Sequence, residues 1–421
     1  MCTKNRWLAI LLIAALTIPA LAITPLAGAQ EGPTPEAVGL RPDAPPYALH
    51  GPYWVGARDF VIDPDSERPL TVTVWYPALN PEGLPEEITY TIFEDCAIRS
   101  MFPTVTDWSI QGHALADAAQ DSSQAPYPLV VYSHGSNAWR QESAWSVEHL
   151  ASMGFVVMAP DHSGEIPGHG SSQAMIIRPN DMRRVIDYAE QLTAPGGVLA
   201  GLIDAQHVGI VGWSMGGSTA LAMGGARYDL AWFENWCTEH PEGDPSNLEC
   251  ADIKYNRRKM LSLANLTTEP EGLWPSMGDP RVQSIVDRSG AVYWYGPAGL
   301  ASITIPVLVQ VGSGDTDIPP QWGADLAYDN VSSAQKAMVV LNGGNHFLFE
   351  NECDSMPWVT EINFYWLCTD PMWDMDQAHD LLNHFTTAFL LATLKGDTDA
   401  AAALAPGSVS FPGITYKAQG F

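Results

Sequence analysis

The sequence predicts an α/β fold in which helices cover both faces of a mostly parallel central sheet. Short apolar runs alternate along the chain with amphipathic helical segments, and this alternation is typical of parallel strands that are buried on both sides. A second observation is the segment at 228–290, which breaks the alternation and is rich in Trp, Pro, Glu and Asp. Because long irregular segments within a compact domain are commonly functional covers, we expect an inserted lid there.

The first residues have the features of an export signal. Lys4 and Arg6 precede an apolar stretch that ends in small residues just before Gln30. This order predicts a signal peptide at 1–29 that is removed, with an uncleaved membrane anchor as the alternative. No later segment offers about 18 uninterrupted apolar residues, so we expect no stable membrane span after signal removal. The sequence therefore predicts a secreted protein, either extracellular or in the periplasm and cell envelope.

The strands are expected to begin after a leader at 30–50, which is rich in Pro and Ala and is predicted to be flexible. Residues 53–62 and 70–76 alternate or run apolar in the manner of a β-hairpin. We assign one domain to residues 51–396, with the lid inserted in it. The further predicted strands are the short apolar runs 128–132, 155–158, 207–211, 305–311 and 337–341.

Three amphipathic helices are predicted between and after these strands. The first, at 141–153, stops at Gly154, and the second, at 181–192, carries its apolar side chains on one face. The third, at 375–394, places Leu and Phe side chains on its inner face and is expected to cover the end of the sheet. The residues beyond it, 397–421, are predicted to be a C-terminal tail.

The net charge of −28 on 421 residues becomes −30 once the two positive charges of the signal are removed. A negative field of this size repels phosphate backbones and anionic membrane surfaces. We therefore expect a neutral substrate and no nucleic-acid partner. The oligomeric state is unknown from the sequence.

Cysteines are predicted to form two local disulfides, because an export compartment permits them. Five of the six cysteines follow the signal. The close pairs Cys237 with Cys250 and Cys353 with Cys368 lie in loop-like sequence, which leaves Cys96 alone. No C-x-x-C motif or His cluster has the spacing of metal ligands, so we expect neither a metal nor a cofactor.

The pattern Gly212-Trp213-Ser214-Met215-Gly216 predicts a nucleophilic serine. It follows a predicted strand and precedes a helix rich in small residues, as the strand-to-helix turn called a nucleophile elbow requires. Glycines two residues before and after Ser214 let the neighbouring backbone approach this strained turn. The helix start then presents N–H groups to developing negative charge.

The base of such a site follows the serine and the acid along the chain. His379 and His384 lie within the last predicted helix, whereas His346 lies in a glycine-bearing loop directly after the last predicted strand. His346 is therefore the expected base. The acid is expected at the end of the preceding strand, where Asp315 and Asp317 compete; Asp315 fits the spacing to the flanking Gly and Pro residues better.

An oxyanion hole needs two donors that are fixed in place before the reaction. The backbone N–H of Met215 is one candidate. The second is expected from the loop after the strand at 128–132, where the pair His134-Gly135 leads to Ser136, whose N–H we assign. His134 itself is expected to anchor the loop rather than to act as acid or base.

These motifs resemble the serine α/β-hydrolases that include platelet-activating-factor acetylhydrolase and bacterial dienelactone-hydrolase-like esterases. The resemblance rests on the runs YPLVVYSHGSNAWR at 127–140 and LASMGFVVMAPDH at 150–162, and on the opening hairpin at 51–77. The hexapeptide at 212–217 is similar to that of cutinase-like polyester hydrolases. Dienelactone hydrolases proper have a cysteine where this chain has Ser214.

The resemblance implies an α/β-hydrolase fold and hydrolysis of short-acyl or small neutral carboxylic esters through an acyl-serine intermediate. A polyester hydrolase that acts on polymeric esters is the first alternative, and a non-catalytic envelope-binding protein on the same fold is the second. Trp139 and Trp213 are candidates for an apolar substrate wall, with a role in core packing as the other interpretation.

Overall fold

The structure is a computed structural model that describes residues 33–421 apart from 95, 163–169 and 241–247. The predicted signal peptide at 1–29 lies outside the described residues and stays a prediction. Within the described part of the chain, no helix is long and apolar enough to cross a membrane.

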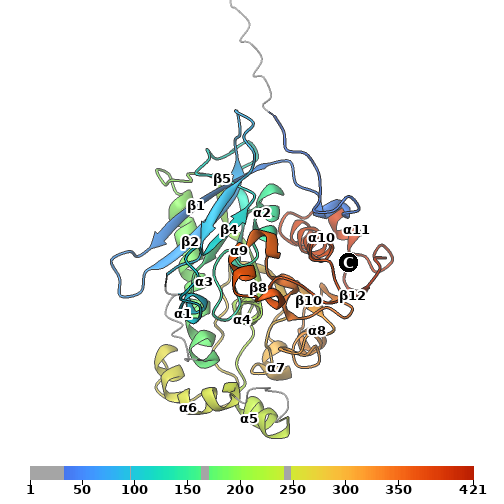
Figure 1. The fold of residues 1–421 in the computed structure, drawn as a ribbon. Helices are drawn as coiled ribbons and strands as arrows, with labels where there is room; N and C mark the ends of the chain where they lie inside the picture. Colours follow the sequence, from blue (N-terminus) through green and yellow to red (C-terminus); the bar gives the residue numbers. More distant parts are fainter. Residues whose placement is uncertain (1–32, 95, 163–169, 241–247) are drawn as a thin grey trace, which may run out of the picture. The chain divides into compact units, whose positions relative to one another are not determined.

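The described chain forms a ten-stranded sheet in the order β12-β11-β10-β9-β8-β6-β7-β2-β1-β5 (Figure 1). The strands from β7 to β11 run parallel to their neighbours, whereas β1, β2 and β12 add antiparallel pairs at the two sides. The α/β prediction is therefore confirmed. The strands are β1 (Trp54–Ile62), β2 (Leu70–Ala78), β5 (Leu115–Ala116), β6 (Tyr127–Ser133), β7 (Val156–Pro160), β8 (Ile203–Trp213), β9 (Val282–Arg288), β10 (Val307–Gly312), β11 (Lys336–Leu341) and β12 (Ile414–Gln419). A separate pair joins β3 (Ile88–Thr91) to β4 (Ser109–Gly112).

Two hydrophobic cores lie on opposite faces of the sheet. Along β6, Leu129 and Val131 belong to one core and Val130 and Tyr132 to the other, because successive side chains of a strand point to opposite faces. Burial on both faces explains why β6 is a continuous apolar run in the sequence.

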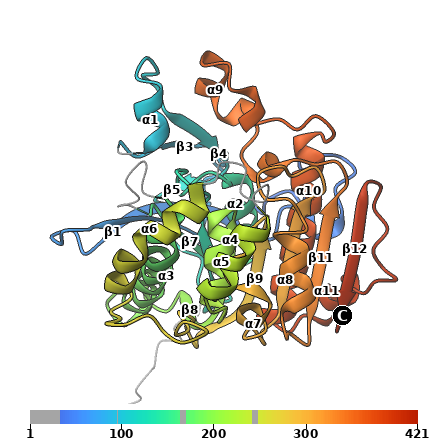
Figure 2. The same cartoon turned by 90° about the horizontal axis from the view of Figure 1, so that it is seen from below.

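Helices cover each core. The first core includes residues of α3 (Ser171–Thr193), α4 (Met215–Met223) and α8 (Ala324–Asn330), which Figure 2 shows on one face of the sheet. The second core includes residues of α2 (Ala144–Ser152) and α10 (Met375–Leu394). The remaining helices are α1 (Ala97–Met101), α5 (Leu230–Glu239), α6 (Leu248–Leu263), α7 (Gly296–Leu300), α9 (Pro357–Glu361) and α11 (Thr398–Ala403), with short 3-10 turns η1 (Pro46–Ala48), η2 (His346–Phe349), η3 (Cys353–Ser355) and η4 (Tyr365–Leu367).

Helix α3 begins ten residues before the predicted start and contains Pro179. Proline removes the hydrogen bond that the carbonyl four residues earlier would accept. In this structure the freed carbonyl of Met175 accepts from the Tyr228 hydroxyl at 2.5 Å, and Asn180 Nδ2 donates to the Ile176 carbonyl at 3.0 Å. A tertiary contact from Tyr228 therefore satisfies the carbonyl that the proline leaves without a donor, and local sequence rules do not predict it.

Two strands lie in segments that the sequence assigns otherwise. Strand β9 falls inside the predicted lid at 228–290, so the insertion ends before Val282. Its apolar pattern is masked by buried polar residues such as Asp287 and Arg288. The predicted tail at 397–421 is also wrong, because these residues form α11 and the edge strand β12, which pairs with β11.

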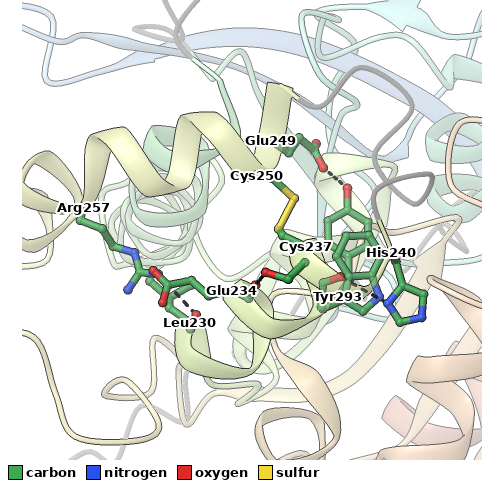
Figure 3. Close-up of a disulfide and its surroundings, with 10 residues drawn as sticks. Leu230, Glu234, Cys237, His240, Glu249, Cys250, Arg257 and Tyr293 are labelled. Carbon is green, nitrogen blue, oxygen red and sulfur yellow. Dashed lines mark hydrogen bonds and ion pairs between the residues drawn. A yellow bond between two sulfur atoms is a disulfide. The ribbon is translucent and has the colours of Figure 1, made fainter.

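Both predicted disulfides are confirmed, with Cα–Cα distances of 5.9 Å for Cys237–Cys250 and 4.9 Å for Cys353–Cys368. Cys96 belongs to neither disulfide and is buried. The first disulfide joins the end of α5 to the start of α6, as Figure 3 shows.

The insertion is also held by ion pairs and hydrogen bonds. Arg257 of α6 pairs with Glu234 of α5 at 2.8 Å, and Glu249 accepts a hydrogen bond from the Tyr293 hydroxyl (Figure 3). The helix α6 packs against α3. The described part of the insertion is therefore an ordered helical pair that is fixed to the domain.

Candidate active site

Ser214 lies at the turn between β8 and α4 with φ 54° and ψ −119°, a left-handed region that non-glycine residues rarely adopt. A Cβ at Gly216 would lie 1.8 Å from the Ser133 carbonyl oxygen, and one at Gly212 would lie 2.1 Å from the Gly216 carbonyl oxygen. Glycine is therefore required on both sides of this turn. The serine itself is half-buried, at the point where the strand ends.

His346 and Asp315 form a buried hydrogen-bonded pair, with 2.7 Å between His346 Nδ1 and Asp315 Oδ2. The other carboxylate oxygen of Asp315 accepts the backbone N–H groups of Asp317 and Ile318 at 2.9 and 2.8 Å. Asp317 is exposed, so of the two candidate acids Asp315 is the one that contacts the imidazole. Because Nδ1 faces the carboxylate, Nε2 is left for proton exchange.

The histidine loop contacts the serine turn through Trp213. The indole Nε1–H of Trp213 donates to the His346 carbonyl at 3.1 Å, and the two rings have centroids 5.2 Å apart. The loop is also packed on the end of β10, since a Cβ at Gly312 would lie 2.2 Å from the Gly344 carbonyl oxygen. The structure thus brings the loops that carry the serine, acid and histidine together at the carboxyl ends of parallel strands, where α/β sheets commonly bind ligands.

The loop after β6 lies against the same turn, because the Ser133 carbonyl faces Gly216. Its Gly135 N–H donates to both carboxylate oxygens of the buried Glu142, at 2.9 and 3.0 Å. The Gly135 N–H is therefore already hydrogen-bonded, and Ser136 carries the next N–H along the loop. Arg178 of α3 donates to the carbonyls of His134 and Gly135, which fixes the loop from the other side.

His134 is buried and bonded within this loop. Its Nδ1 lies 2.8 Å from the Gly135 carbonyl oxygen, and its Nε2 accepts the backbone N–H of His162 at 3.1 Å. Burial lowers the pKa of His134 well below its usual value. These contacts agree with the predicted anchoring role.

Two buried carboxyl groups near the loop were not predicted from the sequence. Burial raises the pKa of Glu142 to about 8, although the Tyr132 hydroxyl also donates to it at 2.8 Å. Burial and the nearby Glu142 raise the pKa of Glu350 well above its usual value. Neither residue belongs to a motif, and their places become visible only when β6, α2 and the histidine loop are assembled.

A cavity of about 370 Å³ lies beside the elbow. It is lined by residues of α1, by 136–139 of the loop after β6, by Trp213, and by residues between 347 and 367. Trp139 and Trp213 both line it although each is almost fully buried, so they serve as wall and as core packing. Among the described residues, none between 228 and 290 lines this cavity.

A second cavity, of about 380 Å³, is lined by residues of the N-terminal segment from 38 to 55, of α2 and of 351–352, and it includes none of the residues predicted for the site. In the described ranges, no group of three or more His, Cys, Asp or Glu side chains could hold a metal ion.

Comparison with known proteins identifies the family of the fold. The model of the alpha/beta hydrolase family matches residues 130–357, which include the elbow, the acid and the histidine. The chain belongs to the alpha/beta hydrolase family. Within this family, residues 44–167 also match the model of platelet-activating factor acetylhydrolase, isoform II.

Two relatives of this α/β-hydrolase are informative. The cutinase est2 of Thermobifida alba is 31% identical over 104 residues, which are 25% of this chain and 32% of that protein's length. A solved structure, the ferulic acid esterase from Streptomyces cinnamoneus, aligns with a TM-score of 0.54 at 20% identity and covers 86% of this chain and 95% of that one. The structural match supports the fold alone.

Proposed function

We propose that this α/β-hydrolase is a secreted carboxylic ester hydrolase that acts through an acyl-serine intermediate on short-acyl or small neutral esters. The observation that carries the proposal is the strained Ser214 at the end of β8 together with the hydrogen-bonded pair His346–Asp315 on the adjoining loops. The partial matches to a cutinase and to platelet-activating factor acetylhydrolase favour an ester as the substrate.

In the proposed reaction, Ser214 Oγ attacks the ester carbonyl carbon while His346 Nε2 takes its proton. Asp315 holds the imidazole orientation and stabilises its protonated form. The backbone N–H groups of Met215 and Ser136 stabilise the negative oxygen that develops. The imidazolium then protonates the leaving alcohol, and water, activated by the same histidine, releases the acid and restores the serine.

The test is hydrolysis of p-nitrophenyl acetate and butyrate by the mature protein and by Ser214→Ala. We expect the variant to lose at least about 10⁴-fold in kcat. A matched control is Ser408→Ala, because Ser408 is exposed near the C-terminus. Equal rates for Ser214→Ala and the wild-type protein would refute the proposal.

A fluorophosphonate probe separates the enzyme from a non-catalytic binding protein on the same fold. The probe reacts with activated serines, so we expect it to label the wild-type protein and Ser408→Ala, and to leave Ser214→Ala unlabelled. No labelling of the wild-type protein would favour the binding protein.

A polyester hydrolase is the second candidate, favoured by the partial match to a cutinase. The cavity beside the elbow has a volume of about 370 Å³ and is lined by residues of α1 and of the disulfide-bonded segment 353–368, which argues for small substrates. Release of soluble products from an amorphous polyester film would support the polymer activity. Good hydrolysis of small esters without such release would exclude it.

Secretion is proposed from the signal at 1–29, and two disulfides suit an oxidising compartment. N-terminal sequencing of the exported protein is expected to begin at Gln30. An intact first segment on a membrane-bound protein would instead indicate an anchor.

A further inference from the structure

The cavity of about 370 Å³ touches both sides of the proposed catalytic centre. Its lining includes Trp213, which precedes Ser214, and Phe347, which follows His346, and it also includes Ser136. A substrate group attached to the reacting carbonyl would therefore enter this cavity. Its volume is within the range of pockets that bind small molecules.

The outer wall of the cavity is built from aromatic side chains that contact one another. Phe347 and Phe364 pack on Trp366 with ring centroids 4.8 and 4.6 Å away, and Phe102 contacts Phe364 at 4.9 Å. Helices α1 and α9 lie close to each other in both Figure 1 and Figure 2. Aromatic walls favour flat apolar groups, which stack or contact them edge-on.

Two links hold this wall to the rest of the site. The disulfide Cys353–Cys368 closes the segment that carries Phe364 and Trp366. On the other side, the Cys96 thiol lies 3.6 Å from the Asn137 carbonyl oxygen and so contacts the loop that bears Ser136. The cavity is therefore a built part of the site.

One polar group in the lining stands apart from the apolar wall. Glu350 is 1% exposed, and its Oε2 atom is buried without a hydrogen-bond partner among the described residues. The two arginines near the adjacent Glu142 bind other groups: Arg288 donates to Gln310 and Ser146 through Nε and Nη2, and Arg178 donates to backbone carbonyls. Arg288 Nη1 is buried without a partner among the described residues. A buried carboxyl next to Glu142 and without a paired cation is held neutral, so it offers both an O–H donor and a carbonyl acceptor.

We propose that this cavity binds a flat, uncharged ring of the ester substrate that carries a hydroxyl or carbonyl group, and that Glu350 hydrogen-bonds that group. The inference rests on the proposed ester hydrolysis and specifies its substrate class. An unpaired buried polar atom is costly, and a substrate group that satisfies Glu350 removes this cost only when the substrate is bound. A site built for such a contact discriminates against the analogue that lacks the polar group.

The experiment compares matched esters with and without a ring hydroxyl. One series places the ring on the acyl side, as methyl esters of benzoic, phenylacetic and 3-phenylpropanoic acids and their 4-hydroxy counterparts. The other series places it on the alcohol side, as benzyl and 4-hydroxybenzyl acetate. The measured quantity is the ratio of kcat/KM for each hydroxylated ester to that for its parent, which does not depend on the amount of active enzyme.

We expect the wild-type ratio to be at least about fivefold in one series. Glu350→Met keeps the length of the side chain but removes both polar atoms, so its ratio should fall to about one. Glu350→Gln keeps a donor and an acceptor and should retain most of the preference. The matched control is Glu361→Met, an exposed glutamate of α9, whose ratio should equal that of the wild-type protein.

The inference is overturned if the wild-type protein shows no preference in either series, or if Glu350→Met keeps the preference of the wild-type protein. If Glu350→Met does not fold, the wild-type ratio and that of Glu350→Gln still decide the point. The variant Ser214→Ala distinguishes a failure of the proposed function from a failure of the proposed substrate class. Serine-independent hydrolysis of p-nitrophenyl acetate would refute the proposed function, whereas serine-dependent hydrolysis without a Glu350-dependent ratio would refute only the substrate class.

Discussion

Replacing Glu142 by alanine tests whether the loop after β6 must be held in place for catalysis. The carboxyl group of Glu142 accepts the Gly135 N–H through both oxygens, at 2.9 and 3.0 Å. Glu142→Ala leaves this buried N–H without its partner, at a cost of about 1–3 kcal/mol. The loop can avoid that cost only by moving, and its next residue is Ser136, the proposed oxyanion donor. The loss of one oxyanion donor lowers kcat by about 10²- to 10³-fold, which is the largest effect we expect.

The assay measures kcat and KM separately with p-nitrophenyl butyrate, because a displaced oxyanion donor lowers kcat with little change in KM. Glu142→Gln keeps an oxygen that accepts the Gly135 N–H, and we expect it to lose less than about tenfold in kcat. Glu148→Ala is the matched control, since Glu148 is also a buried glutamate but binds the Tyr90 hydroxyl and the His113 N–H. The reasoning is wrong if Glu142→Ala keeps the wild-type kcat, or if Glu142→Gln falls as far as Glu142→Ala.

Three further predictions follow from the same contacts. Asp315→Asn should lower kcat by about 10⁴-fold, whereas Asp317→Asn should stay within about twofold, and equal losses in the two variants would contradict the assignment of the acid. Gly216→Ala should abolish labelling by a fluorophosphonate, because its Cβ would meet a backbone oxygen at 1.8 Å; a fully labelled variant would show that the turn can adjust. Burial raises the pKa of Glu148 to about 8. The folded protein therefore keeps a proton that the unfolded chain releases near the usual pKa of a glutamate. The free energy of unfolding should fall as the pH rises towards 8, by at most about 1.4 kcal/mol per pH unit for this group. Denaturant titrations at pH 5.5 and 8.5 should show a smaller fall in Glu148→Gln than in the wild-type protein, and an identical fall would refute the assignment.

Much of the fold and the site could be predicted because the relevant information is local in the sequence. The elbow at 212–216 requires glycines within two residues of Ser214, and these are adjacent in the chain. The hairpin of β1 and β2 and the buried strand β6 are local in the same sense, since a continuous apolar run needs no knowledge of its partner.

Other features depend on contacts between distant segments and could not be predicted. The continuation of α3 through Pro179 depends on the Tyr228 hydroxyl, which lies 53 positions from the carbonyl that it satisfies. Strand β9 contains Arg288, whose Nε and Nη2 donate to Gln310 and Ser146, and these partners lie far away in the sequence. The helix-breaking Pro179 and the polar Arg288 are both compatible with the fold because distant residues supply hydrogen-bond partners. The local sequence pattern does not contain these partners.

The choice between Asp315 and Asp317 shows how sequence and structure complement each other at this site. The spacing of the sequence favoured Asp315, and its hydrogen bond to His346 is an independent reason for the same choice. By contrast, the buried carboxyl groups of Glu142 and Glu350 belong to no sequence motif that predicts them. Burial raises the pKa of both carboxyls, and the nearby Glu142 raises that of Glu350 further. The net charge of −28 disfavours the approach of anionic molecules. In the proposed site, a neutral Glu350 would select for uncharged polar groups inside the cavity, so a long-range effect and a contact effect both support the proposed neutral class of ester.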